Sequence, residues 1–132
     1  MMRLVRERSF QGLLVWRQAM DLARDCYILT KQFPRSELYG LTSQIRRAAT
    51  SVPANIAEGS GRSTIRDYVN FLRIVQGSLR ELEAYLLLAP EIELVQQEMI
   101  TPLLKQVSSI ARLLNRLIQA LERQSKPSPL TP

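Results

Sequence analysis

The sequence predicts an all-α protein, an antiparallel up-down four-helix bundle whose second helix is kinked at Pro53. Apolar residues recur at alternating steps of three and four along four segments, which is the helical period. Turn residues separate these segments, and no segment shows the two-residue alternation of a strand. We expect an N-terminal arm over residues 1–12, the bundle over 13–124 and a disordered, Pro/Ser-rich tail over 125–132.

The first two helices are predicted in the N-terminal half. The first runs from near Leu13 to Lys31 and ends before Pro34, since the residue preceding a proline disfavours the α region. The second is expected to begin after Ser36, which would serve as its N-cap. The apolar positions of the two helices are Val15, Ala19, Leu22, Cys26, Leu29 and Phe33, then Leu38, Leu41, Ile45, Ala48, Val52 and Ile56.

The last two helices show heptad patterns. Thr64 and Asp67 have capping-box spacing, so the third helix should begin near Ser63 or Thr64, and its pattern continues to Pro90. The fourth helix repeats the pattern up to Leu121. Several apolar residues fall outside the seam that faces the core: Phe71, Ile74, Tyr85, Leu88 and Leu113. A monomeric bundle would expose some of them, which favours self-association.

Pro53 lies inside the second predicted helix, yet the apolar register continues across it through Val52 and Ile56. An interior proline costs about 3 kcal/mol. Burying Val52 and Ile56 is worth roughly 1.5–3 kcal/mol each. We therefore favour one continuous, kinked helix, and a break with a restart near Ser51 is the alternative.

Three further residues of this segment are interpreted as structural or assembly residues with Pro53. The kink would leave the carbonyl of Ala49 without its donor, which the amide of Asn55, a buried water or an Arg could replace. Gly59 fits the helix end, where positive φ is needed. Glu58 lies at the negative end of the helix dipole, where a cation is favoured. We therefore predict a charged pair between Glu58 and an Arg of another helix or subunit.

Charge points to a polyanion or to ion-paired interfaces. The formal net charge is +6, and 15 of the 18 basic residues are Arg, whose planar fork of donors suits phosphates and carboxylates. The third helix carries a stripe of Arg at seven-residue spacing, and Lys105, Arg112, Arg116 and Arg123 form a second outward face on the fourth. The candidate nucleic-acid contacts are Arg46, Arg47, Arg62, Arg66, Arg73 and Arg80. Pairing with Glu between helices or subunits is the alternative, with Arg47 and Arg62 the candidates for Glu58.

Catalytic chemistry is missing from the sequence. The chain has no His, which removes the commonest general base and the His ligands that a di-iron bundle needs. Gly59-Ser60-Gly61 lacks the lysine of a phosphate loop, and Cys26 reads as a small core residue. We expect no enzyme activity, metal or cofactor. No apolar run reaches the roughly 18 residues of a membrane span, so a cytoplasmic protein is expected.

Four motifs carry a resemblance to a known family. They are F-Q-G-L-L-V-W-R-Q-A (Phe10–Ala19), F-P-R-S-E-L-Y-G-L (Phe33–Leu41), Q-I-R-R-A-A-T-S-V-P-A-N-I-A-E-G (Gln44–Gly59) and G-S-L-R-E-L-E (Gly77–Glu83). From Phe10 to about Leu121 the chain resembles the small bacterial four-helix-bundle (S23-like) proteins related to those encoded in 23S rRNA intervening sequences.

The resemblance implies a homopentamer without known enzymatic activity. Relatives include the accessory variability determinant of diversity-generating retroelements, a basic pentameric barrel that associates with a reverse transcriptase and nucleic acid. The implied partners are thus further copies of the chain, RNA or DNA, or a reverse transcriptase. We hypothesise a non-catalytic binding scaffold. The alternative is a protein–protein interaction module whose Arg residues form salt bridges between subunits.

Overall fold

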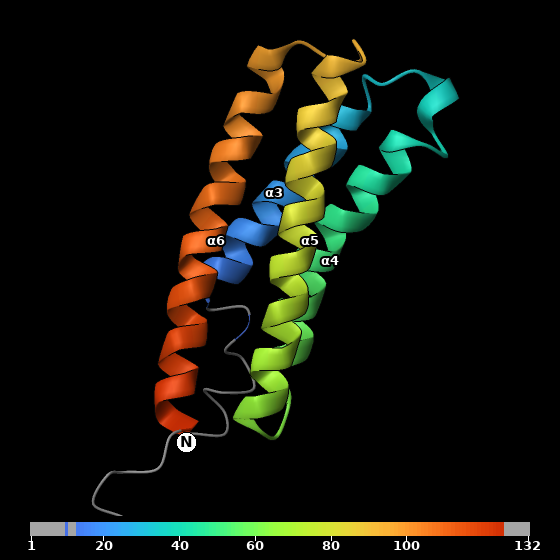
Figure 1. Ribbon diagram of the computed structural model, residues 1–132. Coiled ribbons are helices and arrows are strands. Elements are labelled where there is room, and N and C mark those ends of the chain that lie inside the picture. Colours follow the sequence, from blue (N-terminus) through green and yellow to red (C-terminus); the bar gives the residue numbers. More distant parts are fainter. Residues whose placement is uncertain (1–9, 11–12, 126–132) are drawn as a thin grey trace, which may run out of the picture.

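The computed structural model describes Phe10 and residues 13–125, and every regular element among them is helical. The elements are α3 (Leu14–Thr30), the 3₁₀ helix η1 (Arg35–Glu37), α4 (Leu41–Ser60), α5 (Ile65–Glu91) and α6 (Gln97–Ser125) (Figure 1). The predicted all-α four-helix bundle is therefore confirmed. Apart from Phe10 and Ser125, the expected arm (1–12) and tail (125–132) lie outside the described residues.

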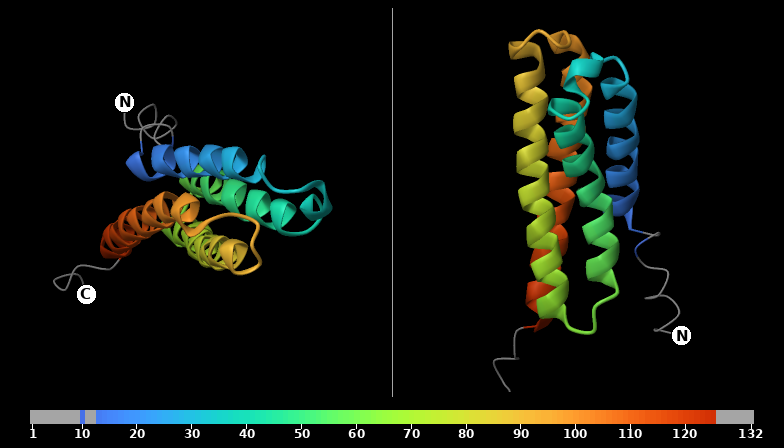
Figure 2. Two further views of the ribbon diagram at one scale, coloured as in Figure 1. Left: turned by 90° about the horizontal axis from the view of Figure 1, so that it is seen from above. Right: turned by 90° about the vertical axis from the view of Figure 1, so that its right-hand side faces the viewer.

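Each helix contacts the next one along the chain, and α6 also packs against α3, so the four helices enclose one core (Figure 2). The core comes mainly from apolar positions of all four helices, as predicted. Leu38 is an exception, because it precedes α4 and is 42% exposed. Its largest fully buried side chains include Leu22, Ile45, Ile56, Leu72, Leu86, Ile110 and Leu114. Burying such a side chain stabilises the fold by about 1.5–3 kcal/mol.

The start of the second helix differs from the prediction. Ser36 is not an N-cap, because it lies in η1 and α4 begins only at Leu41. The Glu37 side chain takes over the capping, since its Oε1 accepts a hydrogen bond of 3.0 Å from the Leu41 amide. A carboxylate suits this place, because the first amides of a helix are unpaired donors at the positive end of its dipole.

The start of α5 follows the prediction. Thr64 has extended backbone, and its hydroxyl accepts a hydrogen bond of 3.1 Å from the Asp67 amide. The helix then continues one residue beyond Pro90, to Glu91. A proline this close to the C-terminal end of a helix disturbs only its last turn.

Helix α4 runs through Pro53, whose ring is buried, so the continuous helix is confirmed and a break near Ser51 is excluded. The bend itself stays a prediction. Asn55 does not serve the Ala49 carbonyl. Its amide instead donates to the Ser51 carbonyl at 2.8 Å and to Ser51 Oγ at 2.9 Å.

The prediction that Gly59 needs positive φ is wrong. No described glycine has positive φ, and Gly59 lies inside α4. A Cβ on Gly59 would lie 2.8 Å from the Cβ of Phe71 and 3.1 Å from Cδ1 of Tyr68. The missing side chain therefore allows close approach of α4 to α5, because a Cβ contact under 3.0 Å cannot be accommodated without a shift.

Candidate nucleic-acid interface

Arg46, the first of the six predicted contacts, connects α4 to α3. Its Nε donates a hydrogen bond of 2.8 Å to Thr30 Oγ1, and the buried Thr30 hydroxyl donates in turn to the Cys26 carbonyl. The guanidinium also lies 4.5 Å from the ring centroid of Tyr27. A cation stacked on an aromatic ring gains about 0.5–1 kcal/mol at an exposed site. These contacts give Arg46 a structural role in joining α4 to α3.

Arg47 connects α4 to α5. Its Nη2 donates to Gln44 Oε1 at 2.7 Å and lies 3.5 Å from Oε2 of Glu81. Tyr85 completes the cluster by donating to the same carboxylate at 3.3 Å. The positive charge of Arg47 is thus offset within the chain.

Glu58 pairs with Arg62, one of its two predicted partners. The pair is formed within the end of α4 and the turn that follows it, not with another helix. The Arg62 guanidinium also lies 4.6 Å from the ring centroid of Phe71 on α5. These contacts hold the α4–α5 turn, and any role of Glu58 between subunits stays a prediction.

The stripe of Arg66, Arg73 and Arg80 along α5 is partly neutralised by ion pairing. Arg73 donates to Gln76 at 3.1 Å and reaches Glu122 of α6 at 3.5 Å. Arg66 and Arg80 are exposed and form no hydrogen bond or ion pair with the rest of the described chain. Exposed ion pairs are worth only about 0–1 kcal/mol, so they dissociate readily, but they lower the charge offered to a ligand.

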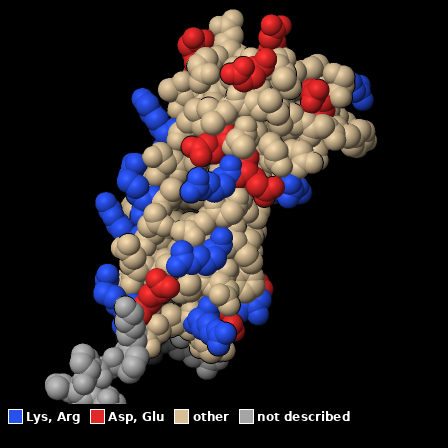
Figure 3. Space-filling view, in the orientation of Figure 1, with Lys and Arg blue, Asp and Glu red and all other residues tan. Residues whose placement is uncertain are grey.

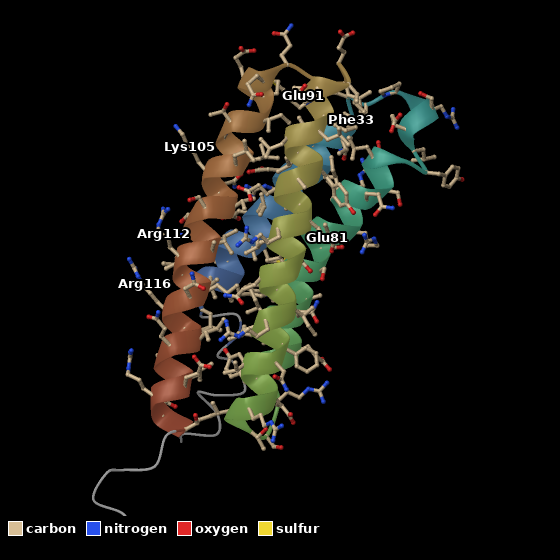
Figure 4. The ribbon with its side chains drawn as sticks, in the orientation of Figure 1. Phe33, Glu81, Glu91, Lys105, Arg112 and Arg116 are labelled. Carbon is tan, nitrogen blue, oxygen red and sulfur yellow. The ribbon has the colours of Figure 1, made fainter. Side chains whose placement is uncertain are left out.

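Helix α6 carries the stronger basic surface. We call Lys105, Arg112, Arg116 and Arg123 the α6 row. All four are exposed, and none forms a salt bridge with a carboxylate in the described part of the chain. Figure 4 shows Lys105, Arg112 and Arg116 pointing away from the bundle, and blue side chains follow the same edge in Figure 3. At 1.5 Å per residue the row spans about 27 Å.

Acidic residues are nearly absent from α6. Glu98 lies in its first turn and Glu122 is engaged by Arg73. Arg112 donates to Ser108 at 2.9 Å, a bond to a neutral partner that leaves its charge uncompensated. Thr101, Ser108 and Gln119 are exposed along the same helix and add neutral hydrogen-bonding groups. Such a face can contact a line of phosphates. Two carboxylates border it: Asp21 shares a hollow with Lys105, and Glu83 shares a groove with Ser108.

Arg80 is the one predicted contact that borders this surface. It lines a groove of about 430 Å³ between α5 and α6, together with Ser108 and Asn115. Asn115 accepts a hydrogen bond of 2.7 Å from Gln76, which links the two helices there. The sequence alone does not distinguish the α6 row from the other basic residues, because the ion pairs that offset Arg47, Arg62 and Arg73 form only in the folded chain.

The opposite charge gathers at one end of the bundle. Glu91, Glu93 and Glu98 surround the connection between α5 and α6, and red side chains mark this end in Figure 3. Blue side chains lie further down the same view. The acidic end and the mainly basic edge along α6 would together orient a charged partner.

The other groups of chemical interest are the possible metal ligands and the buried thiol of Cys26. No group of three or more His, Cys, Asp and Glu that could hold a metal occurs among the described residues. Burial raises the pKa of the Cys26 thiol to about 12, and the nearby Asp25 carboxylate adds to the rise. A thiol with so high a pKa is a poor nucleophile at neutral pH. None of the described helices is long and apolar enough to cross a membrane.

These features define a class of protein: a basic four-helix bundle with an acid-poor outer helix and no metal-binding cluster among its described residues. The family model of the 23S rRNA-intervening sequence proteins matches residues 11–116, so the chain belongs to that family. No match was found among curated proteins.

The fold also has a counterpart among solved structures. A protein of unknown function from the S23 ribosomal protein family of Bacteroides thetaiotaomicron VPI-5482 is 24% identical to this chain, with a TM-score of 0.72. The similarity covers 80% of this chain and 98% of that one. At this identity the likeness supports the shared bundle fold.

Proposed function

We propose that this protein is a non-catalytic, cytoplasmic, homo-oligomeric scaffold that binds nucleic acid through the α6 row. The observation that carries the proposal is the row itself: four exposed cations on one helix with no carboxylate partner in the described chain. Proteins that neutralise phosphates with Lys and Arg gain most of their affinity from released counterions. A row of about 27 Å would follow roughly eight base-pair steps of a duplex at 3.4 Å each.

Self-association is the second part of the proposal. Ile74, Leu87 and Leu88 are about half exposed on α5, and Tyr39 is almost fully exposed before α4. Leu87 and Leu88 are adjacent, and exposed apolar side chains gathered at one place favour a protein partner. The pentamer follows from the family resemblance, and a ring would place several α6 rows on one particle. A reverse transcriptase or another nucleic-acid enzyme is the further partner we propose.

Titration of labelled RNA and DNA, single-stranded and duplex, tests the binding. If the four cations each meet one phosphate of DNA, the slope of log affinity against log salt is about −3.6 per bound subunit. Affinity should therefore fall steeply between about 50 and about 200 mM KCl. Absence of binding at the lowest salt would overturn the nucleic-acid proposal. Light scattering after size exclusion gives the oligomer, and a single 15.1 kDa chain would contradict the scaffold.

The second candidate function is an interaction module that binds only proteins. The ion pairs of Arg47, Arg62 and Arg73 favour it, because they show that this chain uses Arg to join neighbouring segments. An oligomer that binds neither RNA nor DNA at low salt would support this candidate.

A further inference from the structure

A long groove runs along the outer seam of α3 and α4. Its lower part, of about 500 Å³, is formed largely by Phe10, Trp16, Met20, Pro53, Ala54 and Ala57, together with Tyr27. A second hollow of about 420 Å³ continues from Tyr27 and Thr50 toward Tyr39. We call the two together the α3–α4 groove. Small side chains from α4 on its floor would let a helix approach closely.

Charge along this groove has one sign. The charged residues that line it are Arg24, Arg46 and Arg47, and no Asp or Glu lines either part. Arg24 and Arg47 already meet carboxylates of this chain, whereas Arg46 pairs with none among the described residues and donates to Thr30 through its Nε. The terminal amino groups of Arg46 are therefore placed to receive an added carboxylate. An apolar floor beside cations fits an amphipathic helix with acidic flanks.

The same chain has an apolar surface with acidic residues, of the kind that would fit this groove, on α5. Beyond Arg80 the outer side of α5 becomes apolar and acidic, and we call this surface the α5 ridge: Glu83, Ala84, Leu87, Leu88, Glu91 and Ile92. All six are exposed, with Leu87 at 48% and Leu88 at 44%. No basic residue occurs between Arg80 and Lys105. Red side chains border the upper part of this face in Figure 3.

The geometry points to a contact in which the α5 ridge of one copy occupies the α3–α4 groove of the next. The inference rests on the self-association in the proposed function and names its two surfaces. The two surfaces share no residue, and α5 lies across the bundle from α3 (Figure 2), so one copy can use both at once. Such a head-to-tail contact is heterologous, and it produces a ring when the rotation between copies closes.

Two single variants test the assignment. Ala54→Glu places a bulky acid on the groove floor, and Leu88→Lys places a cation on the ridge, so each should reduce the oligomer to a 15.1 kDa monomer. Each variant still has one intact surface. An equimolar mixture should therefore form a particle of two chains that grows no further, which no symmetric contact would produce.

The controls separate this inference from a loss of folding. Ile28→Lys changes a residue of α3 that is 53% exposed and lines neither surface, so it should keep the wild-type size. Circular dichroism should show wild-type helix content for all three variants. Trp16, the only Trp, lies in the groove, so its quenching by acrylamide should decrease on association and stay high in Ala54→Glu.

The possible outcomes distinguish the two proposals. A monomeric wild type would overturn the self-association itself. An oligomeric wild type whose size is unchanged in both variants, or folded monomeric variants that fail to combine in the mixture, would overturn the assignment of these two surfaces and leave self-association standing.

Discussion

At the scale of single residues, the side chains around each arginine decide whether its charge is already paired within the chain. Arg73 on α5 pairs with Glu122 of α6, whereas Arg116 on α6 meets no carboxylate in the described structure. Both side chains carry the same charge, but a paired guanidinium must exchange its partner before it can bind a phosphate. The availability of each Arg is therefore set by the helix face it occupies.

Cys26 gives a prediction at this scale. Its pKa rises from an ordinary value of 9.0 to about 12. Above pH 9 the unfolded chain loses the thiol proton and the folded chain keeps it, so the free energy of unfolding falls as pH rises toward 12. The expected decline is about 1.4 kcal/mol per pH unit from this group.

Urea unfolding of wild type and Cys26→Ala at pH 8 to 11 measures the effect, since the alanine variant lacks the titrating group. The stability difference between the two proteins should shrink above pH 9. A difference that stays constant would contradict the prediction. Alkylation of the native thiol at pH 8 should also be far slower than in urea.

At the scale of helices, side-chain contacts decide where each element begins and how closely it packs. Thr64 fixes the start of α5, and Glu37 fixes the start of α4. Gly59 lets α4 approach Phe71, while Ser51 and Ser78 share a hydrogen bond of 2.8 Å further along the same contact. The α4–α5 pair is thus held by a close backbone approach and by polar bonds.

Two glycine substitutions test the close approach. Alanine is about 1 kcal/mol better than glycine inside a helix. Gly77→Ala on α5 should stabilise the protein by about that amount, because a Cβ there has no atom within 4 Å. Gly59→Ala should instead destabilise by about 1–3 kcal/mol, since the new Cβ would overlap Phe71. The unfolding temperatures of both variants, compared with wild type, test the two expectations. Equal stabilisation by the two substitutions would show that α4 does not need a glycine at position 59.

The N-cap of α5 provides a separate test. Thr64→Ala removes the acceptor of the Asp67 amide and should cost about 0.5–2 kcal/mol. Ser63→Ala, one residue earlier, is the matched control and should leave the unfolding midpoint unchanged. Equal effects from the two variants would mean that the Thr64 hydroxyl does not cap the helix.

Helix number, helix order and most core positions could be predicted because the apolar spacing repeats locally, as at Ile45, Val52 and Ile56. The start of α4 could not, because its cap is a glutamate in the preceding turn. The role of Gly59 and the pairing of Arg73 with Glu122 could not be predicted from the sequence either. They depend on atoms from helices far apart in sequence, and spacing within one helix carries no information about them.

At the scale of the whole molecule, the bundle separates three surfaces. The α6 row is basic, the α5 ridge is apolar and acidic, and the α3–α4 groove is apolar and bordered by Arg. If the ridge and the groove join neighbouring copies, the α6 row is the surface left for another ligand. Repeating the row around a ring raises the effective affinity for a long polyanion well above that of one copy.

Salt-dependent binding to duplex RNA and DNA by two charge-matched variants tests the central claim most directly. Arg112→Gln/Arg116→Gln removes half of the α6 row, and Arg47→Gln/Arg73→Gln removes two arginines that are paired within the chain. The first should weaken binding and reduce the magnitude of the salt slope for DNA by about 1.8 per subunit, and the second should change it little. Equal losses from both variants, or a larger loss from the second, would contradict binding through the α6 row.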